Sequence, residues 1–228
     1  MKEKKSTLKQ KNTGNEYKSL IPNSTSINMK NTSVWGPGEN ITLKTIEHEI
    51  RNGKWLNLGA GDGRYTKKIV NKADELILAD IDKSKLKKAK NLINEKKKIK
   101  LKIFDMTKTF PFDDNAFDGV FCTGTLHLFS PKKIKSILIE VDRILKPYGK
   151  IILDFATDIK RTFKNKPNKK FQTPKYTFDK AKSMLKKNLI NYELKIKKSK
   201  FKDDLTDKKE HGFKTSGNFF LIIGRKNK

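Results

Sequence analysis

Short apolar runs alternate with amphipathic segments along the chain from residue 54 to its end. Apolar runs bounded by turn residues are typical of buried strands, and apolar positions three or four residues apart are typical of helices. This pattern predicts strands at residues 54–59, 75–80, 99–104, 117–123, 149–155, 191–200 and 217–225. It predicts helices near residues 63–71, 83–96, 131–145 and 178–189. Strands that alternate with helices indicate an α/β domain built on a doubly wound, mostly parallel sheet.

The helix predicted at residues 131–145 has the clearest periodicity. Its apolar residues fall on one face: Ile134, Ile137, Leu138, Val141, Ile144 and Leu145. Pro131 stands near its start and Pro147 lies beyond its end, where helices tolerate proline. A helix with a single apolar stripe is suited to covering a sheet. The last two strands have no helix between them, so we expect them to pair antiparallel at the sheet edge.

The two ends of the chain differ in character. Residues 1–30 are polar, rich in Lys, Asn, Ser and Thr, and are expected to form a tail with little fixed structure. Apolar residues between positions 41 and 50 suggest a short helix that leads to the first strand. We therefore expect one folded domain at residues 31–228, with a basic insertion at about 158–176 on the substrate side.

Apolar stretches stay below the roughly 20 residues that a membrane helix needs, and no apolar segment follows the basic N-terminus as in a secretory signal. The only cysteine, Cys122, cannot form an internal disulfide and lacks partners for a cysteine-based zinc site. These features predict a protein without a membrane span or a bound metal that works in the cytoplasm.

Residues 56–63 (LNLGAGDG) join an apolar strand to three closely spaced glycines and then to a helix. Glycine allows positive φ, and without a Cβ atom the backbone can approach a ligand at the carboxyl end of the strand. A plain strand-to-helix turn is the alternative, which three glycines within five residues disfavour. The loop therefore predicts a nucleotide-cofactor crevice.

The second predicted strand ends in Asp80, about 20 residues beyond the glycines. In a doubly wound sheet that position faces the ribose of a bound nucleoside, whose hydroxyls a carboxylate can bind. Asp82 could replace it, but its position favours a cap on the following helix. Asp80 is thus the strongest single candidate for cofactor binding.

The glycine spacing separates two classes of cofactor. Dinucleotide sites have the pattern G-x-G-x-x-G, with a pyrophosphate at the helix N-terminus. This chain has G-x-G-x-G, and Asp62 inside the loop would repel a pyrophosphate. The loop therefore favours a cofactor without phosphate.

Three further segments follow in a fixed order. They are Asp105-Met106 with residues 110–120 (FPFDDNAFDGV), residues 125–127 (TLH), and residues 140–150 (EVDRILKPYGK). With the glycine loop and Asp80, they make residues 54–156 resemble class I S-adenosylmethionine-dependent methyltransferases of the UbiE-like, or type 11, group. Tyr148 departs from this pattern, because the family usually has a second glycine there.

The resemblance implies a Rossmann-like, seven-stranded sheet whose last strand is inserted antiparallel, and it implies S-adenosylmethionine as cofactor. By position, Gly59, Ala60 and Gly61 would pass beneath the methionine and ribose of the cofactor. Asp80 and Ile81 would meet the ribose side, Asp105 and Met106 the adenine, and Thr123 would contact the cofactor from the end of the fourth strand. Asp118 is interpreted as structural.

The methyl group of a sulfonium is already activated, so the protein chiefly aligns the acceptor and excludes water. If the acceptor carries a proton, His127 is the candidate base that lies closest to the end of the fourth strand. The alternative is a histidine that only lines the pocket wall. Cys122 lies within an apolar strand and is interpreted as a core residue.

The acceptor is less well defined by the sequence. Methyltransferases of exocyclic amino groups usually carry an Asn/Asp-Pro-Pro-Tyr/Phe motif after the fourth strand, where this chain has CTGT at residues 122–125. The insertion interleaves lysines with Phe163, Phe171 and Tyr176, which could stack on bases of an RNA or form a solvated lid. A small molecule is the favoured acceptor, with RNA and protein as alternatives.

The formal net charge is +28, from 53 Lys and Arg against 25 Asp and Glu. Such an excess favours polyanion binding, but the lysines are spread along the chain and arginines are few, so a compositional bias explains it equally well. Two other functions remain open: a nicotinamide-dependent oxidoreductase on a similar sheet, and a non-catalytic RNA-binding protein.

Overall fold

The computed structural model describes residues 37–91, 93, 98–163, 175–203 and 213–228. The expected N-terminal tail, Phe171 and the middle of the predicted insertion lie outside these residues. The strands are β1 (Lys54–Leu58), β2 (Glu75–Asp80), β3 (Ile99–Ile103), β4 (Phe117–Cys122), β5 (Leu145–Phe163), β6 (Tyr192–Asp203) and β7 (Phe213–Lys226). The α-helices are α2 (Pro37–Glu49), α3 (Thr66–Val70), α4 (Lys83–Asn91), α5 (Pro131–Ile144) and α6 (Phe178–Asn188).

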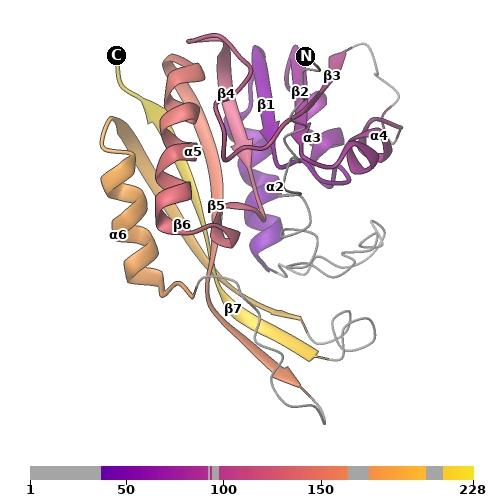
Figure 1. Ribbon diagram of the computed structural model, residues 1–228. Helices are drawn as coiled ribbons and strands as arrows, with labels where there is room; N and C mark the ends of the chain where they lie inside the picture. The colour runs from indigo at the N-terminus through magenta and orange to yellow at the C-terminus, as the bar shows by residue number, and fades with distance from the viewer. Residues whose placement is uncertain (1–36, 92, 94–97, 164–174, 204–212) are drawn as a thin grey trace, which may run out of the picture.

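All seven strands form one sheet in the order β3-β2-β1-β4-β5-β7-β6 (Figure 1). Strands β1 to β5 pair in parallel, whereas β7 runs antiparallel between β5 and β6. The predicted α/β class, the strand number and the antiparallel C-terminal strand are therefore confirmed. Because β1 and β4 are neighbours but β2 leaves on the other side of β1, the strand order reverses at this point. Open α/β sheets bind ligands at such a reversal, beyond the carboxyl ends of the strands.

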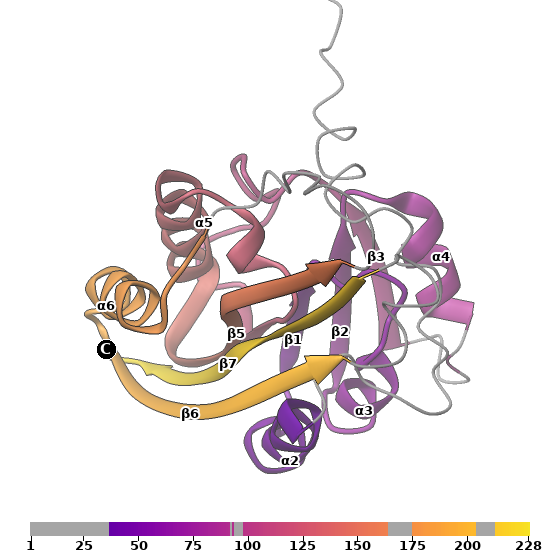
Figure 2. The same cartoon turned by 90° about the horizontal axis from the view of Figure 1, so that it is seen from below.

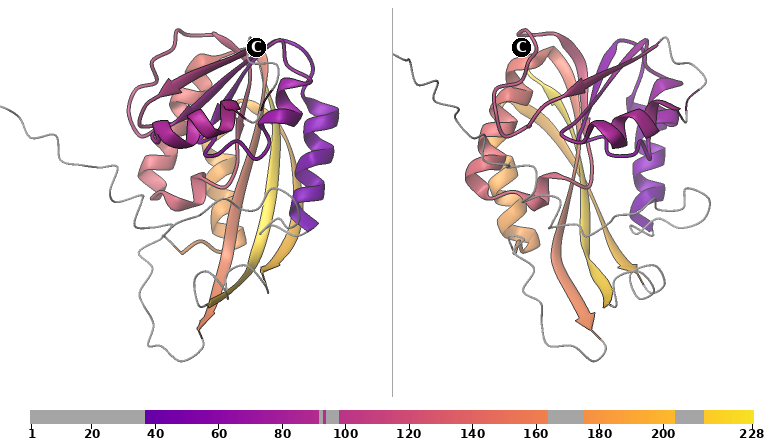
Figure 3. Two further views of the ribbon diagram at one scale, coloured as in Figure 1. Left: turned by 90° about the vertical axis from the view of Figure 1, so that its right-hand side faces the viewer. Right: turned by 45° about the vertical axis from the view of Figure 1, so that its right-hand side comes forward.

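Helices cover both faces of the sheet (Figure 3). The apolar stripe predicted on α5 is buried with α6 against one face, in a cluster that includes Val120 and Phe155. Helices α2, α3 and α4 pack on the other face, in a cluster that includes Trp55 and Phe121. The inner strands are thus mostly apolar on both sides, which explains the short apolar runs of the sequence. Among the described residues, no helix is both long and apolar enough to cross a membrane.

Strand β5 is much longer than predicted. It begins directly after α5, with Leu145 opposite Phe117, and the residues Lys146 to Gly149 then bulge out before Lys150 pairs with Gly119. Tyr148 sits in this bulge with φ of 62°. The sequence pattern indicates a turn at these residues, although pairing with β4 is present on both sides of the bulge.

The other end of β5 also differs from the prediction, since the strand continues to residue 163 instead of ending at 155. A second bulge interrupts the pairing with β7 after Thr157, and pairing resumes from Lys160 opposite Ser216. The first part of the predicted insertion is therefore strand. Beyond this bulge β5, β7 and β6 form an arm that extends past the helices at the carboxyl edge (Figures 1 and 2).

One arginine joins two of the sequence segments that marked the family resemblance. Arg143, near the end of α5, donates from Nη1 to Phe112 O (2.8 Å) and to Asp114 Oδ1 (2.7 Å), and from Nη2 to Phe110 O (3.1 Å). Its Nη2 also donates to Glu140 Oε2 (2.8 Å), which accepts a hydrogen bond from Phe110 N (2.7 Å). Arg143 and Glu140 thereby fix the chain between β3 and β4 onto α5.

Candidate active site

The glycine turn, residues 59–63, leaves β1 at its carboxyl end. Gly59, Gly61 and Gly63 have φ of 72°, 54° and 89°, values that side-chain-bearing residues rarely adopt. The N–H groups of Gly59 and Ala60 both donate to Ala79 O, at 2.8 and 2.9 Å. These bonds fix the turn onto the end of β2. The helix predicted from residue 63 begins only at Thr66, because the turn occupies the preceding residues.

Three loops meet at Gly59. A Cβ atom on this glycine would lie 2.7 Å from Thr125 Oγ1 in the loop after β4, and 3.1 Å from Met106 Cε in the loop after β3. Gly61 is different, because a Cβ atom there would meet nothing within 4 Å. The backbone of Gly61 therefore borders open space, as the predicted passage of a cofactor over this turn requires.

Asp80 links the ends of β1 and β2. Its Oδ2 accepts a hydrogen bond from Gly61 N and its Oδ1 accepts one from Asp82 N, both at 2.9 Å. A carboxylate has about four acceptor sites, so each oxygen retains one for a ligand. Two vicinal hydroxyl groups of a ribose match this capacity.

Asp82 has the role of a helix cap. Its Oδ1 accepts hydrogen bonds from Ser84 N (2.9 Å) and Lys85 N (3.3 Å) at the start of α4. Burial raises the pKa of its carboxyl group, but these bonds and that of the Ser84 hydroxyl outweigh burial, so the pKa lies below its ordinary value. Because Asp82 caps α4, Asp80 is the carboxylate of this pair that contacts the glycine turn.

The remaining predicted residues lie at the ends of neighbouring strands. Asp105 Oδ1 accepts hydrogen bonds from Thr107 N and Thr107 Oγ1, both at 2.8 Å, which shapes the turn after β3. The Ile81 side chain follows Asp80 and is 40% exposed. Ile103, the β3 partner of Asp80, is 48% exposed and was not predicted as a site residue. Its place beside Asp80 depends on strand register, which the sequence pattern does not reveal.

A second carboxylate was also missed. Asp154 lies in β5, is only 2% exposed, and accepts a hydrogen bond at Oδ1 from Gly124 N at 2.6 Å. Burial raises its pKa to about 7, although the Gly124 bond acts in the opposite direction. Gly124 follows Thr123, whose carbonyl accepts the Thr125 hydroxyl at 3.0 Å. An acid within the run Ile151 to Phe155 was a visible signal, because an isolated charge in an apolar strand needs a reason.

His127 lies on the short 3-10 helix η2 (Leu126–Leu128), directly after the loop of Thr125. Its ring is 8% exposed and its centroid is 6.2 Å from that of Phe155. Cys122 is fully buried, and burial raises its thiol pKa well above the ordinary value. The interpretation of Cys122 as a core residue is confirmed.

Two glycines of the turn differ in what surrounds them, which gives a paired prediction. Gly61→Ala should cost about 1 kcal/mol of stability, from the left-handed backbone alone, and should weaken cofactor binding by filling open space. Gly63→Ala should cost about 2 kcal/mol or more, because a Cβ there would lie 2.6 Å from Ala89 Cβ on α4. Urea unfolding and calorimetric titration of both variants check this; equal stability losses would contradict it.

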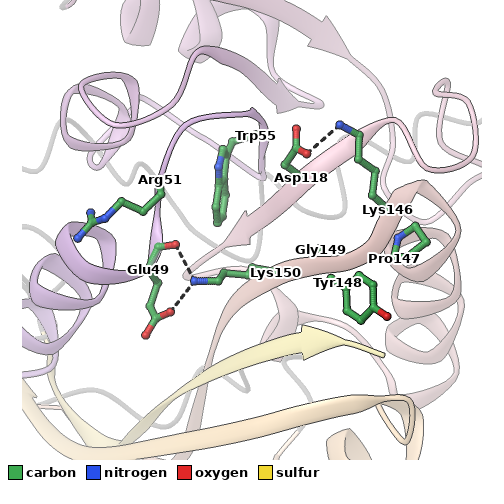
Figure 4. A pocket seen from close by; sticks show the side chains of 9 residues that line it. All are labelled: Glu49, Arg51, Trp55, Asp118, Lys146, Pro147, Tyr148, Gly149 and Lys150. Atoms are coloured by element: carbon green, nitrogen blue, oxygen red, sulfur yellow. Dashed lines mark hydrogen bonds and ion pairs between the residues drawn. The ribbon is translucent and has the colours of Figure 1, made fainter. Parts of the chain in front are cut away.

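A hollow of about 170 Å³ lies at the opposite, amino edge of the sheet (Figure 4). It is lined by Glu49, Arg51, Trp55, Asp118, Lys146, Pro147, Tyr148, Gly149 and Lys150. Lys150 Nζ is 3.0 Å from Glu49 Oε2, and Lys146 Nζ is 2.8 Å from Asp118 Oδ1. Asp118 also accepts Lys54 N at 2.8 Å, in line with its predicted structural role. These ion pairs connect the start of β5 to the start of β4 and to the end of α2, and the hollow is separate from the glycine turn.

Known proteins share these features. Residues 56–153 match the family model described as a methyltransferase domain. The N-methyltransferase NodS from Bradyrhizobium japonicum, in complex with S-adenosyl-L-homocysteine, is similar in structure with a TM-score of 0.67 and 12% identity, over 94% of this chain and 100% of that chain. YcgJ from Bacillus subtilis has a TM-score of 0.62 and 17% identity, over 83% and 97%. PH0226 from Pyrococcus horikoshii OT3 has the same TM-score and identity, over 93% and 99%. At such identities the structural likeness establishes the fold.

The family match also indicates which part of the chain is similar in sequence to known methyltransferase domains. It begins within β1, runs through the glycine turn and ends within β5, so it includes the three loops that meet at Gly59, those after β1, β3 and β4. Residues 56–153 thus match the methyltransferase-domain family model, and the seven-stranded sheet that contains them has the fold of the similar structures.

Proposed function

We propose that this enzyme transfers a methyl group from S-adenosylmethionine to a small-molecule acceptor. The main support for a cofactor site is the hydrogen bond from Gly61 N to Asp80 Oδ2. This bond holds the carboxylate that would bind the ribose beside the backbone of Gly61, which borders open space. In this proposal Gly59, Ala60 and Gly61 pass beneath the methionine and ribose.

The other cofactor contacts follow the ends of the strands. Asp80 binds the ribose hydroxyls, and exposed Ile81 provides an apolar surface for the adenosine. Asp105 and the Met106 backbone meet the adenine amino group. Thr107 donates both of its hydrogen bonds to Oδ1 of Asp105, which leaves Oδ2 as the acceptor for the amino group. Thr123 contacts the cofactor from the end of β4.

The cofactor supplies a methyl group that is already activated for transfer. The protein then has to orient the acceptor and exclude water. The loops after β4 and β5 suit this task because Phe155 lies below them, with its ring in edge contact with His127 and Tyr176. Phe155 itself is fully buried, so it holds His127 and Tyr176 in place from the core and supports a pocket of fixed shape for a compact acceptor.

The contacts of Tyr176 weaken one argument for RNA as the acceptor. Its hydroxyl donates to Phe129 O at 2.6 Å, and its ring centroid is 4.9 Å from that of Phe155. These contacts give Tyr176 a structural role, so its presence in the insertion does not require RNA as the acceptor. The side chains of Phe163 and Phe171 lie outside the described residues. RNA remains the second acceptor class, supported by the net charge of +28.

Two measurements test the proposal. Calorimetric titration should show micromolar binding of S-adenosylhomocysteine and no binding of NAD(H); the reverse result would contradict the cofactor. Purified enzyme and a radiolabelled methyl donor are then added to extract from a deletion strain, followed by fractionation. Label confined to RNA or protein would contradict a small-molecule acceptor.

His127 is proposed as the base that accepts a proton from the acceptor. Replacing it with Gln should lower kcat about 100-fold, the usual contribution of general base catalysis, and leave the Kd of S-adenosylhomocysteine unchanged. The loss should shrink at high pH if the acceptor ionises by itself. A kcat within threefold of wild type would instead leave His127 as part of the pocket wall.

A further inference from the structure

The buried carboxylate of Asp154 interrupts an otherwise apolar strand. Leu153 and Phe155 pack in the cluster beneath α5 and α6, and Ile152 and Ala156 pack in the cluster on the α2 side. Since side chains alternate along a strand, Asp154 lies on the α2 side, beside the apolar contacts of Ile152. An acid is costly here, because burial disfavours its charged form.

The cost of this charge has a definite pH dependence. The pKa of Asp154 is raised to about 7 in the folded protein, above the ordinary value of 3.8. Its contribution to stability is therefore most favourable at low pH and is lost as the pH rises through 7. An asparagine would have nearly the same shape and would keep an oxygen acceptor without this cost. Stability alone thus gives no reason for an acid at this position.

Asp154 is instead connected to the proposed cofactor site. It accepts the N–H of Gly124, the middle residue of the loop at residues 123–125, which we name the β4 loop. Gly124 has φ of 68°, so the loop takes a conformation that needs support. The same loop places Thr125 against the glycine turn at Gly59. One hydrogen bond therefore connects β5 to the point where the three loops meet.

We propose that Asp154 is a positioning residue for the cofactor, whose ionised carboxylate holds the β4 loop in its binding conformation through the Gly124 N–H. The inference rests on the proposed function. Hydrogen bonds to an ionised acceptor are roughly twice as strong as neutral ones. Cofactor binding therefore favours ionised Asp154 and releases a proton when the pH is below about 7.

Other titratable groups lie on the elements next to β4 and β5. The Cys122 thiol lies on β4. Burial is the largest cause that raises its pKa, and the negative charges of Asp154 and Asp80 raise it further. Tyr65 lies before α3, with its ring against Phe121 of β4. The partner of Asp154 on β7 is the uncharged Leu221. His127 on η2 belongs to the residue type that ordinarily titrates near pH 7, so the test has to separate it from Asp154.

The test measures the Kd of S-adenosylhomocysteine by calorimetry between pH 6 and pH 8.5. For wild type, binding should weaken about tenfold for each pH unit below the Asp154 pKa. Titrations in buffers with different ionisation enthalpies should show proton release. Asp154→Asn should bind about tenfold more weakly at pH 8 with a flat pH profile, while its Tm at pH 8 is equal to wild type or higher.

Two controls accompany this variant. Asp118→Asn replaces a carboxylate that also accepts a backbone N–H, from Lys54, but at the amino edge; it should retain the wild-type Kd and pH profile. His127→Asn should also retain the profile, which assigns the slope to Asp154.

Wild-type affinity and slope in Asp154→Asn would overturn the inference. If this variant fails to fold, the wild-type profile decides, and a flat profile overturns it. Failure of wild type to bind S-adenosylhomocysteine at any pH is a different result, because it overturns the proposed function itself.

Discussion

Asp80→Ala should weaken S-adenosylhomocysteine binding by about 100-fold or more. The variant removes two potential charge-assisted hydrogen bonds to a ribose, each worth about 1.5–3 kcal/mol, and 1.4 kcal/mol corresponds to a factor of ten in Kd. It also removes the acceptor that holds Gly61 N in the glycine turn. Calorimetric titration measures the effect directly, and circular dichroism verifies the fold.

Asp82→Ala is the matched control for this prediction. Asp82 is an aspartate two residues away whose side chain caps α4 through Ser84 and Lys85. Its replacement should cost about 1 kcal/mol of stability as a lost helix cap, with a Kd within about threefold of wild type. A folded Asp80→Ala protein that binds as well as Asp82→Ala would contradict the assigned ribose contact.

Arg143→Ala should produce the largest loss of stability, about 3–4 kcal/mol, because it removes one partner of a network of part-buried hydrogen bonds. The carbonyls of Phe110 and Phe112 and the carboxylate of Glu140 would each lose a donor. In a domain of this size the Tm should fall by roughly 6–15 °C. Thermal and urea unfolding measure both quantities.

Lys146→Ala provides the comparison for Arg143. Lys146 also forms an ion pair, with Asp118, but the two side chains are 46% and 37% exposed. Exposed pairs contribute little, so the expected loss is below about 1 kcal/mol. Arg143→Lys should recover only part of the lost stability, because an ammonium cannot reproduce the planar fork of five donors. Equal losses for Arg143→Ala and Lys146→Ala would disprove the role of the network.

The sequence was sufficient for the parts of the fold that depend on local pattern. Helix α5 and the strands β2 and β4 have nearly the predicted bounds, because the apolar stripe of α5 and the apolar residues of the two strands are buried in the core. The family resemblance supplied the antiparallel β7. The glycine turn was recognisable for a physical reason, since closely spaced glycines permit the positive φ angles that the structure contains.

Features that depend on contacts distant in sequence could not be predicted in the same way. The length of β5 depends on pairing with β4 and β7 across two bulges, whose residues resemble ordinary turns. Ile103 became a site candidate only when strand register placed it beside Asp80. Asp154 was visible as an acid in an apolar run, but its hydrogen bond to Gly124, 30 residues earlier, was not.

The order of the strands also explains why some of the lysines lie where they do. The sheet ends in β3 on one side and β6 on the other, so each has one edge that pairs with no strand of the described sheet. Exposed lysines occupy both: Lys100 and Lys102 on β3, and Lys195, Lys197, Lys198 and Lys200 on β6. An open edge is a template for pairing with another chain, and lysines there oppose it by bringing like charges together. Two copies of this protein would therefore repel each other where their sheets could join.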